Sequence, residues 1–228
     1  MRVDVVQPID DVVVGDNAPD SIINLFDNFD DPFTTGQVVT FQVENLDGAP
    51  NGGQIELVLF DQPGEGAPIA TERFSSLVND GSFDNLIINR GDVGFVIQAG
   101  QFTIDPETLT VGAVPTVPTI QGQPSPERSN TLGTIAFAQS NFPGTTTSNP
   151  DSATSQFFFN LSDSNSFLDE QGFTSFGAVL TVEDFAVTDA IANDPVFTPF
   201  QGNSGFIDGS VDLNEVIFFS DISIESQD

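Results

Sequence analysis

The stretch "SATSQFFFNLSDSNSFLDEQGFTSFGAVL", residues 152–180, sets the pattern of the fold. It contains three consecutive phenylalanines, Phe157, Phe158 and Phe159, in a strand-like run at 155–162. Successive side chains of a strand point to opposite faces, so Phe157 and Phe159 are expected to face opposite to Phe158. Composition alone places all three in a core. The stretch therefore predicts a strand with apolar side chains on both faces.

Working outward, the chain is a succession of short strand-like runs with two helical segments. A helix is predicted at 67–81, with Phe74 and Leu77 on one face, and a second near 181–193. A long loop rich in Pro, Thr and Gln is expected at 103–130. Further strands are expected at 54–61, 86–88, 93–98, 133–139, 155–162, 215–219 and 221–225. Many short strands with two helices favour a β-barrel or sandwich over an alternating parallel sheet.

Residues 1–50 differ from the rest and are predicted to form an extended β arm. Their β-type runs at 11–16, 21–26 and 38–46 are separated by Pro, Gly and Asp clusters. The pattern resembles the opening of cadherin-like repeats in large bacterial surface proteins, although a whole sandwich needs about 100 residues. We therefore divide the chain into this arm and a main domain, 51–228. An unpaired β segment can extend a neighbour's sheet, so self-assembly through the arm is expected.

The charge balance restricts the partners. The chain has 34 acidic and 4 basic side chains, and its formal net charge of −30 repels nucleic acid and anionic lipid. Its apolar runs are too short to span a bilayer, and Met1–Asp4 does not begin a secretory signal. We expect neither nucleic acid nor membrane as a partner. The acidity indicates either a well-solvated surface or calcium binding, with candidate ligands at 27–32 and 212–215.

The missing residue types narrow the chemistry. The chain has no Cys, His, Lys, Trp or Tyr. This excludes disulfides, the usual zinc sites, Ser-His or Cys-His nucleophile pairs and Schiff bases. Any catalysis must use carboxylates, hydroxyls, backbone groups or an arginine, and we expect no cofactor, with calcium as the alternative.

Four ordered segments resemble the cyclophilin family of peptidyl-prolyl isomerases. They are the helical segment at 67–85, "NLIINRGDVGFVIQAG" at 85–100, "SNTLGTIAFAQ" at 129–139 and the stretch at 152–180. The resemblance covers about 53–225 and is similar to bacterial extracellular members. It implies a mainly β fold: a closed, eight-stranded antiparallel cyclophilin-like barrel with two flanking helices, to which the N-terminal arm is added.

The resemblance also implies a site. Arg90 falls on the family's catalytic arginine, and Phe95, Gln98, Phe158 and Leu168 match retained substrate-binding positions. The other substrate-binding positions depart from the family, with Val96 for Met, Gln139 for Asn, Phe167 for Trp, and Phe173 near the place of the pocket His. The plain alternative for Arg90 is a surface ion pair, worth about 0–1 kcal/mol.

The function that the resemblance implies is cis/trans isomerisation of X-Pro bonds in proline-containing polypeptide segments. An arginine would hydrogen bond to the prolyl nitrogen over an apolar proline pocket. The alternatives are a catalytically weak binding or structural module of an extracellular assembly, and a calcium-stabilised surface domain. The surface-protein resemblance of the arm predicts an extracellular or cell-surface location.

Overall fold

The computed structural model describes residues 4–5, 29–194 and 216–226. The strands are β1 (Asp4–Val5), β2 (Phe29–Asp30), β3 (Gln37–Glu44), β4 (Gln54–Leu59), β5 (Leu86–Ile87), β6 (Arg90–Asp92), β7 (Val96–Ala99), β8 (Phe102–Asp105), β9 (Thr110–Ala113), β10 (Thr134–Phe137), β11 (Phe157–Asn160), β12 (Ser175–Val179) and β13 (Phe218–Ser226). The helices are α1 (Pro68–Asn79) and α2 (Val182–Asn193), with 3-10 segments η2 (Pro50–Gly53), η3 (Pro150–Ser152) and η4 (Asp163–Gln171).

Eleven of these strands form one antiparallel sheet, in the order β6-β7-β11-β10-β12-β4-β3-β13-β5-β8-β9. Within the described residues no ladder joins its two ends, β6 and β9. The chain nevertheless connects distant parts of the sheet, because β5 pairs with β13 and β6 pairs with β7. Only Ile88 and Asn89 separate β5 from β6. The Ile88 N–H donates to the Ile217 carbonyl beside β13, and the Asn89 N–H donates to Gln98 in β7. One segment therefore borders both β13 and β7.

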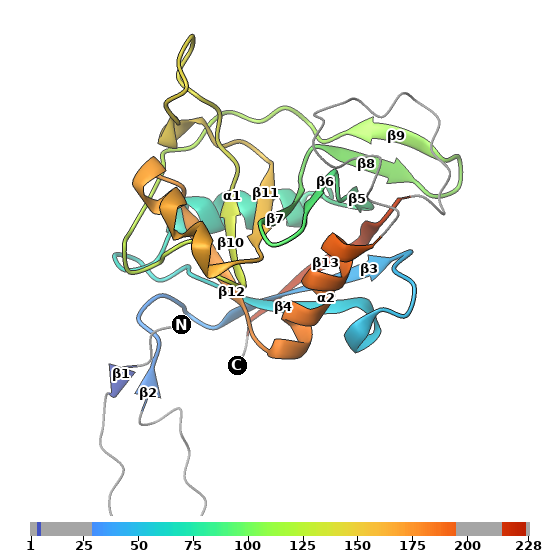
Figure 1. The fold of residues 1–228 in the computed structure, drawn as a ribbon, viewed down its shortest axis with the longest axis horizontal. Coiled ribbons are helices and arrows are strands. Elements are labelled where there is room, and N and C mark those ends of the chain that lie inside the picture. Colours follow the sequence, from blue (N-terminus) through green and yellow to red (C-terminus); the bar gives the residue numbers. More distant parts are fainter. Residues whose placement is uncertain (1–3, 6–28, 195–215, 227–228) are drawn as a thin grey trace, which may run out of the picture.

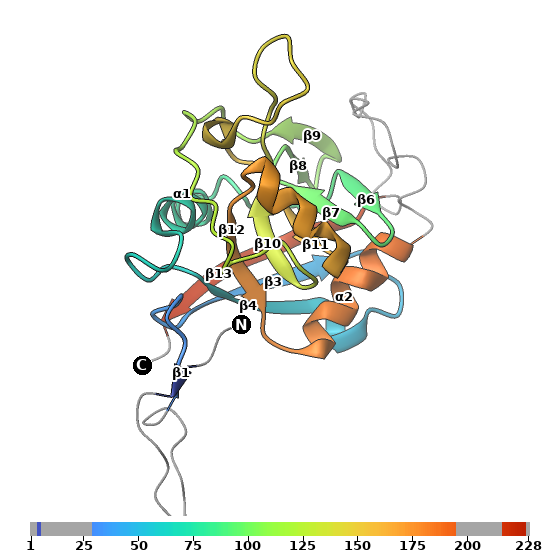
Figure 2. The same ribbon diagram turned by 60° about the vertical axis from the view of Figure 1, so that its left-hand side comes forward.

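With β5 and β6 taken as one strand, eight strands surround the core, and β8 and β9 form a hairpin outside them. The helices α1 and α2 lie on different sides of this body (Figure 2). The predicted mainly β, barrel-like fold with two flanking helices is confirmed, although the ladders of the described residues do not form a closed ring.

The interior of the barrel is packed with phenylalanine. The Phe41 ring in β3 lies 4.9–6.2 Å, centroid to centroid, from the rings of Phe74, Phe157, Phe159 and Phe219. All five side chains are fully buried. Such aromatic pairs add about 0.5–1.5 kcal/mol beyond the burial of their area. Phe157 and Phe159 therefore face the core, as the alternation predicts.

Both predicted helices are present. In α1, Phe74 and Leu77 are buried, and proline occupies the first helical position, where its missing N–H costs nothing. In α2, Thr181 and Asp184 form a reciprocal capping box that satisfies backbone donors at the helix start.

The predicted domain boundary near residue 50 is wrong for one strand. β3 lies in the expected arm, yet it pairs with both β4 and β13 in the main sheet. Its Val39, Phe41 and Val43 are buried because they alternate on the face that points into the barrel. Apart from β3, the described part of the arm includes the short β1–β2 pair, which lies away from the barrel (Figure 1).

The predicted loop at 103–130 is also only partly correct. It contains the hairpin β8–β9, and its remainder is fastened to the barrel by two arginines. Arg128 is buried and donates to three backbone carbonyl oxygens at 2.6–3.0 Å, including that of Ser175. Arg73 donates from α1 to the Pro118 carbonyl at 2.6 Å. Guanidinium donors thus satisfy carbonyls of the irregular chain, such as that of Pro118, and one at the start of β12.

Some sequence predictions fall outside the described residues. These are the strands at 11–16 and 21–26, the acidic stretch at 212–215 and part of the one at 27–32. Within the ranges that are described, no helix is long and apolar enough to cross a membrane. The same ranges hold no cluster of three ligand side chains of the kind that binds a metal ion.

Candidate active site

The site is built on the outer face of β6, β7, β11 and β10. Arg90 lies opposite Gln98, Gln98 opposite Phe158, and Phe158 opposite Ala136, so one cross-strand row runs over four strands. Side chains in such a row share a face and lie within contact distance. Phe158 therefore packs outside the main core, in a small cluster with Val96, Ala136 and Leu168. This position agrees with the prediction that Phe158 faces opposite to Phe157 and Phe159.

A pocket of about 170 Å³ opens on this face. Its lining comprises Arg90, Phe95, Val96, Gln98, Ala138, Gln139, Phe158, Leu168 and Phe173. Eight of the nine residues predicted from the sequence are in this set, and Phe167 is not. Pockets for drug-sized ligands measure about 300–1,000 Å³, so this one accommodates a single small side chain.

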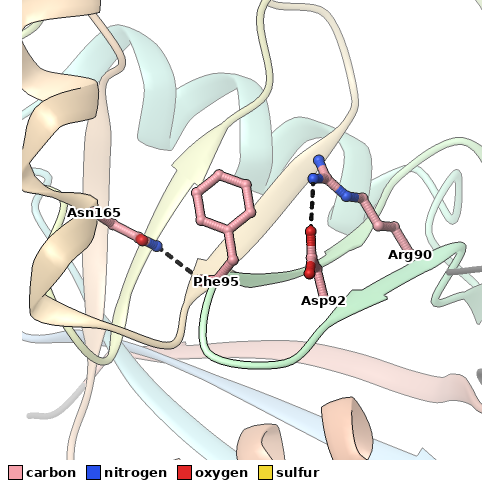
Figure 3. Close-up of polar contacts among 4 residues, drawn as sticks. All are labelled: Arg90, Asp92, Phe95 and Asn165. Atoms are coloured by element: carbon pink, nitrogen blue, oxygen red, sulfur yellow. Dashed lines mark hydrogen bonds and ion pairs between the residues drawn. The ribbon is translucent and has the colours of Figure 1, made fainter. Parts of the chain in front are cut away.

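Arg90 stands at the rim of the pocket. Its Nη2 lies 3.2 Å from Oδ2 of Asp92, and its guanidinium carbon lies 5.3 Å from the centroid of the Phe95 ring (Figure 3). Arg90 and Asp92 are two residues apart on β6 and so project from the same face. The Arg90 side chain is 40% exposed, so the ion pair is weak and leaves donors directed elsewhere.

Two glutamines provide the other polar groups of the lining. Gln98 donates from Nε2 to Oε1 of Gln156, at 2.9 Å. Gln139 donates to the Gly172 carbonyl at 2.7 Å and accepts from the Ser148 hydroxyl at 2.7 Å. The Gln139 side chain therefore ties together two loops at the rim, a role distinct from the substrate contact predicted for it.

The aromatic walls come from different elements. Phe173 follows the left-handed Gly172 at the end of η4, and its ring meets Phe158 edge-on, 5.7 Å between centroids. Phe167 is 49% exposed and stacks on Phe95, 6.2 Å between centroids at an interplanar angle of 12°. Phe173 thus lines the pocket, whereas Phe167 extends the apolar surface beyond Phe95.

The sequence reasoning missed two residues of the site, Ala138 and Asp92. Ala138 directly precedes Gln139 at the end of the strand-like run, and this adjacency is its only signal. Asp92 had a clearer signal, because it alternates with Arg90 in a strand and is charged. Its effect on Arg90 follows from that spacing.

Comparison with known proteins decides the family. Residues 39–205 match the family described as cyclophilin type peptidyl-prolyl cis-trans isomerase/CLD. The chain belongs to this family. This cyclophilin is 37% identical over 152 residues to a peptidyl-prolyl cis-trans isomerase of Acinetobacter baylyi, covering 65% of the chain and 71% of the relative. It is 36% identical over 146 residues to peptidyl-prolyl cis-trans isomerase A of Dickeya dadantii, covering 62% and 67%.

Solved structures agree on the fold. A cyclophilin type isomerase of Cryptosporidium parvum superposes on this cyclophilin with a TM-score of 0.54 at 21% identity, covering 85% of this chain and 99% of that one. A second structure of that protein, in the presence of the dipeptide Ala-Pro, gives a TM-score of 0.53 at 20% identity, covering 83% and 99%. The predicted family, fold and enzyme class are confirmed. Self-assembly through the arm and an extracellular location stay predictions.

Proposed function

We propose that the pocket of this cyclophilin binds the proline ring of X-Pro segments in polypeptides, and that Arg90 catalyses rotation about the X-Pro bond. One observation carries the proposal: a guanidinium with only one of its N–H groups engaged by Asp92 stands at the rim of a cavity that has aromatic and aliphatic walls and the size of a single side chain. The family supplies the reaction, and this geometry supports the roles proposed below for the residues.

Arg90 suits the chemistry of the rotation. Twisting an X-Pro amide breaks partial double-bond character against a barrier of about 18–20 kcal/mol. In the twisted state the lone pair returns to the prolyl nitrogen, which then accepts a hydrogen bond. A guanidinium N–H directed at that nitrogen stabilises the twisted state more than the planar one, which is the requirement for catalysis. No proton leaves and no covalent bond forms, so the reaction needs no His, Cys, Lys or cofactor.

The apolar walls contribute in a second way. Phe95, Phe158, Leu168 and Phe173 offer little solvation to the planar amide, which is more dipolar than the twisted one. They also select proline by shape, because burying a side chain of that size is worth about 2 kcal/mol. Binding and catalysis therefore use different parts of the same pocket.

Gln98 is the group best placed to orient the substrate backbone. It lies directly opposite Arg90 in the β6–β7 ladder, and Gln156 fixes its amide by accepting from Nε2. Its Oε1 then has a defined direction and can accept a backbone N–H.

The test is an NMR exchange assay on an Ala-Pro peptide, with the wild type, Arg90→Ala and Arg90→Lys. Removing a single donor aimed at the transition state costs about a hundredfold or more in kcat, so Arg90→Ala should lose about that factor. Arg90→Lys should recover little, because an ammonium does not reproduce the fixed planar donors. Peptide Kd from chemical-shift titration should change much less than kcat.

Arg73→Ala is the matched control. It removes the same side chain from α1, where the guanidinium bonds the Pro118 carbonyl rather than facing the pocket. Its activity per folded molecule should equal that of the wild type. A wild type that binds the peptide without accelerating exchange would show a binding module instead of an isomerase.

A further inference from the structure

Beneath the pocket lies a group of buried asparagines that do not line it. Asn130 and Asn160 have no exposed surface, and Asn165 is 1% exposed. Asn130 precedes β10, Asn160 ends β11, and Asn165 lies in η4. Three amides so completely removed from water require partners, because a buried polar group without a hydrogen bond is costly.

Their hydrogen bonds form one continuous chain. Asn165 donates from Nδ2 to the Phe95 carbonyl and to Oδ1 of Asn160, each at 2.8 Å (Figure 3 shows the first). Asn160 donates from Nδ2 to Oδ1 of Asn130 at 3.3 Å. Asn130 donates from Nδ2 to the Phe173 carbonyl at 3.2 Å. The chain thus begins at one wall of the pocket and ends at another.

Two branches reinforce the chain. Asn160 also donates to Oγ1 of Thr134 at 2.9 Å, within the sheet. Asn130 is fixed by Asp169, whose Oδ1 accepts both its backbone N–H, at 2.8 Å, and its side-chain amide, at 2.9 Å. Asp169 follows directly on Leu168 of the pocket. The branches hold the middle of the chain to β10 and one end to η4.

The two walls also have backbone hydrogen bonds of their own: the Phe95 N–H donates to Asp92 and its carbonyl accepts from Leu161, while the Phe173 N–H donates to Leu168. These bonds hold each wall locally, whereas the asparagine chain joins one wall to the other. Phe95 lies in the turn between β6 and β7, and Phe173 lies between η4 and β12, so neither belongs to a strand. A residue in a loop is less restrained than a residue in a ladder. A buried hydrogen-bond network in which every group is satisfied can make such a loop rigid.

We propose that Asn165, Asn160 and Asn130 are positioning residues that set the separation of Phe95 and Phe173, and hence the affinity of the pocket for proline. The proposal rests on the proposed function insofar as proline is the ligand. It assigns these residues to binding, whereas Arg90 is assigned to turnover.

The experiment compares Asn165→Ala, Asn130→Ala and the double variant. Asn165→Ala removes the links to Phe95 and Asn160, and Asn130→Ala removes the side-chain links to Asn160, Asp169 and Phe173. Either change interrupts the chain between the two walls, and we expect about a fivefold rise in the Kd and KM of an Ala-Pro peptide, which corresponds to about 1 kcal/mol. The kcat should stay within about twofold, because the arginine is untouched. The Kd of the double variant should be about equal to that of the weaker-binding single variant. Either substitution alone already disconnects Phe95 from Phe173, so the two effects should not add.

Thr71→Val is the matched control. Thr71 is buried in α1 and donates from its hydroxyl to the Pro68 carbonyl, away from the pocket. It should lower thermal stability as the asparagine variants do and leave Kd unchanged. Unchanged Kd in both asparagine variants would overturn the proposal, as would effects that multiply in the double variant.

A measurement on the wild type covers the case in which the variants do not fold. On titration with the peptide, the side-chain amide resonances of Asn165, Asn160 and Asn130 should shift with the same midpoint as Phe95. That of Asn193, an exposed residue at the end of α2, should not. Unmoved resonances of all three buried amides would refute the linkage.

The outcomes separate this proposal from the proposed function. Peptide binding without turnover would overturn only the catalytic role of Arg90. No peptide binding by the wild type would overturn both.

Discussion

Two adjacent phenylalanines give the sharpest test of how this cyclophilin divides its apolar residues between fold and function. Phe158 and Phe159 are both almost fully buried, yet they face opposite sides of β11. We predict that Phe158→Ala mainly reduces activity and that Phe159→Ala mainly reduces stability. The two changes remove the same atoms from neighbouring positions, so only the surroundings differ.

The magnitudes follow from those surroundings. Phe159 lies in the main core, with its ring centroid 5.4 Å from that of Phe41 and 6.5 Å from that of Phe219. Truncation there leaves a closed cavity and should cost about 3–5 kcal/mol of unfolding free energy. Phe158 borders the existing pocket, so its loss adds mainly the transfer term, about 2 kcal/mol.

The functional effect has the opposite order. Phe158 forms part of the proposed proline surface, and losing about 2 kcal/mol of apolar contact corresponds to about a thirtyfold fall in kcat/KM. Phe159 does not line the pocket. Phe159→Ala should therefore keep the wild-type kcat/KM per folded molecule.

Urea unfolding gives the stabilities, and a protease-coupled assay on an Ala-Pro peptide gives the activities. Phe158→Leu and Phe159→Leu repeat the comparison if the alanine variant of the core position does not fold. The reasoning is refuted if Phe158→Ala stays within about twofold of wild-type kcat/KM. It is equally refuted if both variants lose the same activity per folded molecule.

Three further predictions concern charged groups. Asp92→Asn keeps an acceptor for Arg90 but removes the opposing charge. The kcat/KM should therefore rise by about two- to fivefold in the same assay. The unfolding free energy should change by less than about 1 kcal/mol. Arg128→Met should lower the unfolding free energy in urea by about 3 kcal/mol. The three charge-assisted hydrogen bonds that it removes are worth about 1.5–3 kcal/mol each, and the cost of burying the charge offsets part of this sum. An unchanged midpoint would contradict this. Hydrogen bonds from the Thr108 side chain, and then from backbone N–H groups, hold the pKa of Asp105 below its ordinary value of 3.8. The ionised Asp105 therefore stabilises the folded protein above pH 3.8, and this stabilisation is lost as the pH falls through the lowered pKa. The difference in urea midpoint between wild type and Asp105→Ala should accordingly shrink from pH 6 to pH 3.

The sequence predicted those parts of the site that depend on local periodicity. The alternation at Phe157–Phe159 separates core from pocket correctly, because the pleat of a strand fixes it. The spacing of Arg90, Phe95 and Gln98 likewise predicts their proximity correctly. Arg90 lies in β6, Phe95 in the short turn and Gln98 in β7, and all three line the pocket.

The rest depends on contacts between distant segments. Asn165 and Phe95 are separated by 70 positions, and no pattern in either stretch indicates their hydrogen bond. The sequence predicts that β3 belongs to the arm, because its surroundings are rich in Pro, Gly and Asp. Its place in the barrel depends instead on pairing with β13, near the other end of the chain. Pairing over such a distance is decided by burial of the whole core.

The three arginines in the described part of the chain show how a guanidinium can act in a protein of net charge −30. Arg128 is buried and Arg73 is half-buried, and both donate to backbone carbonyls, which hold them in fixed geometry. Arg90 pairs instead with Asp92, its own neighbour on β6. Asp92 contacts only Nη2 of the guanidinium, and Arg90 lines the pocket. The ion pair that is the plain alternative for Arg90 is therefore compatible with the catalytic role, because it occupies Nη2 and leaves the other N–H groups available for a twisted prolyl nitrogen.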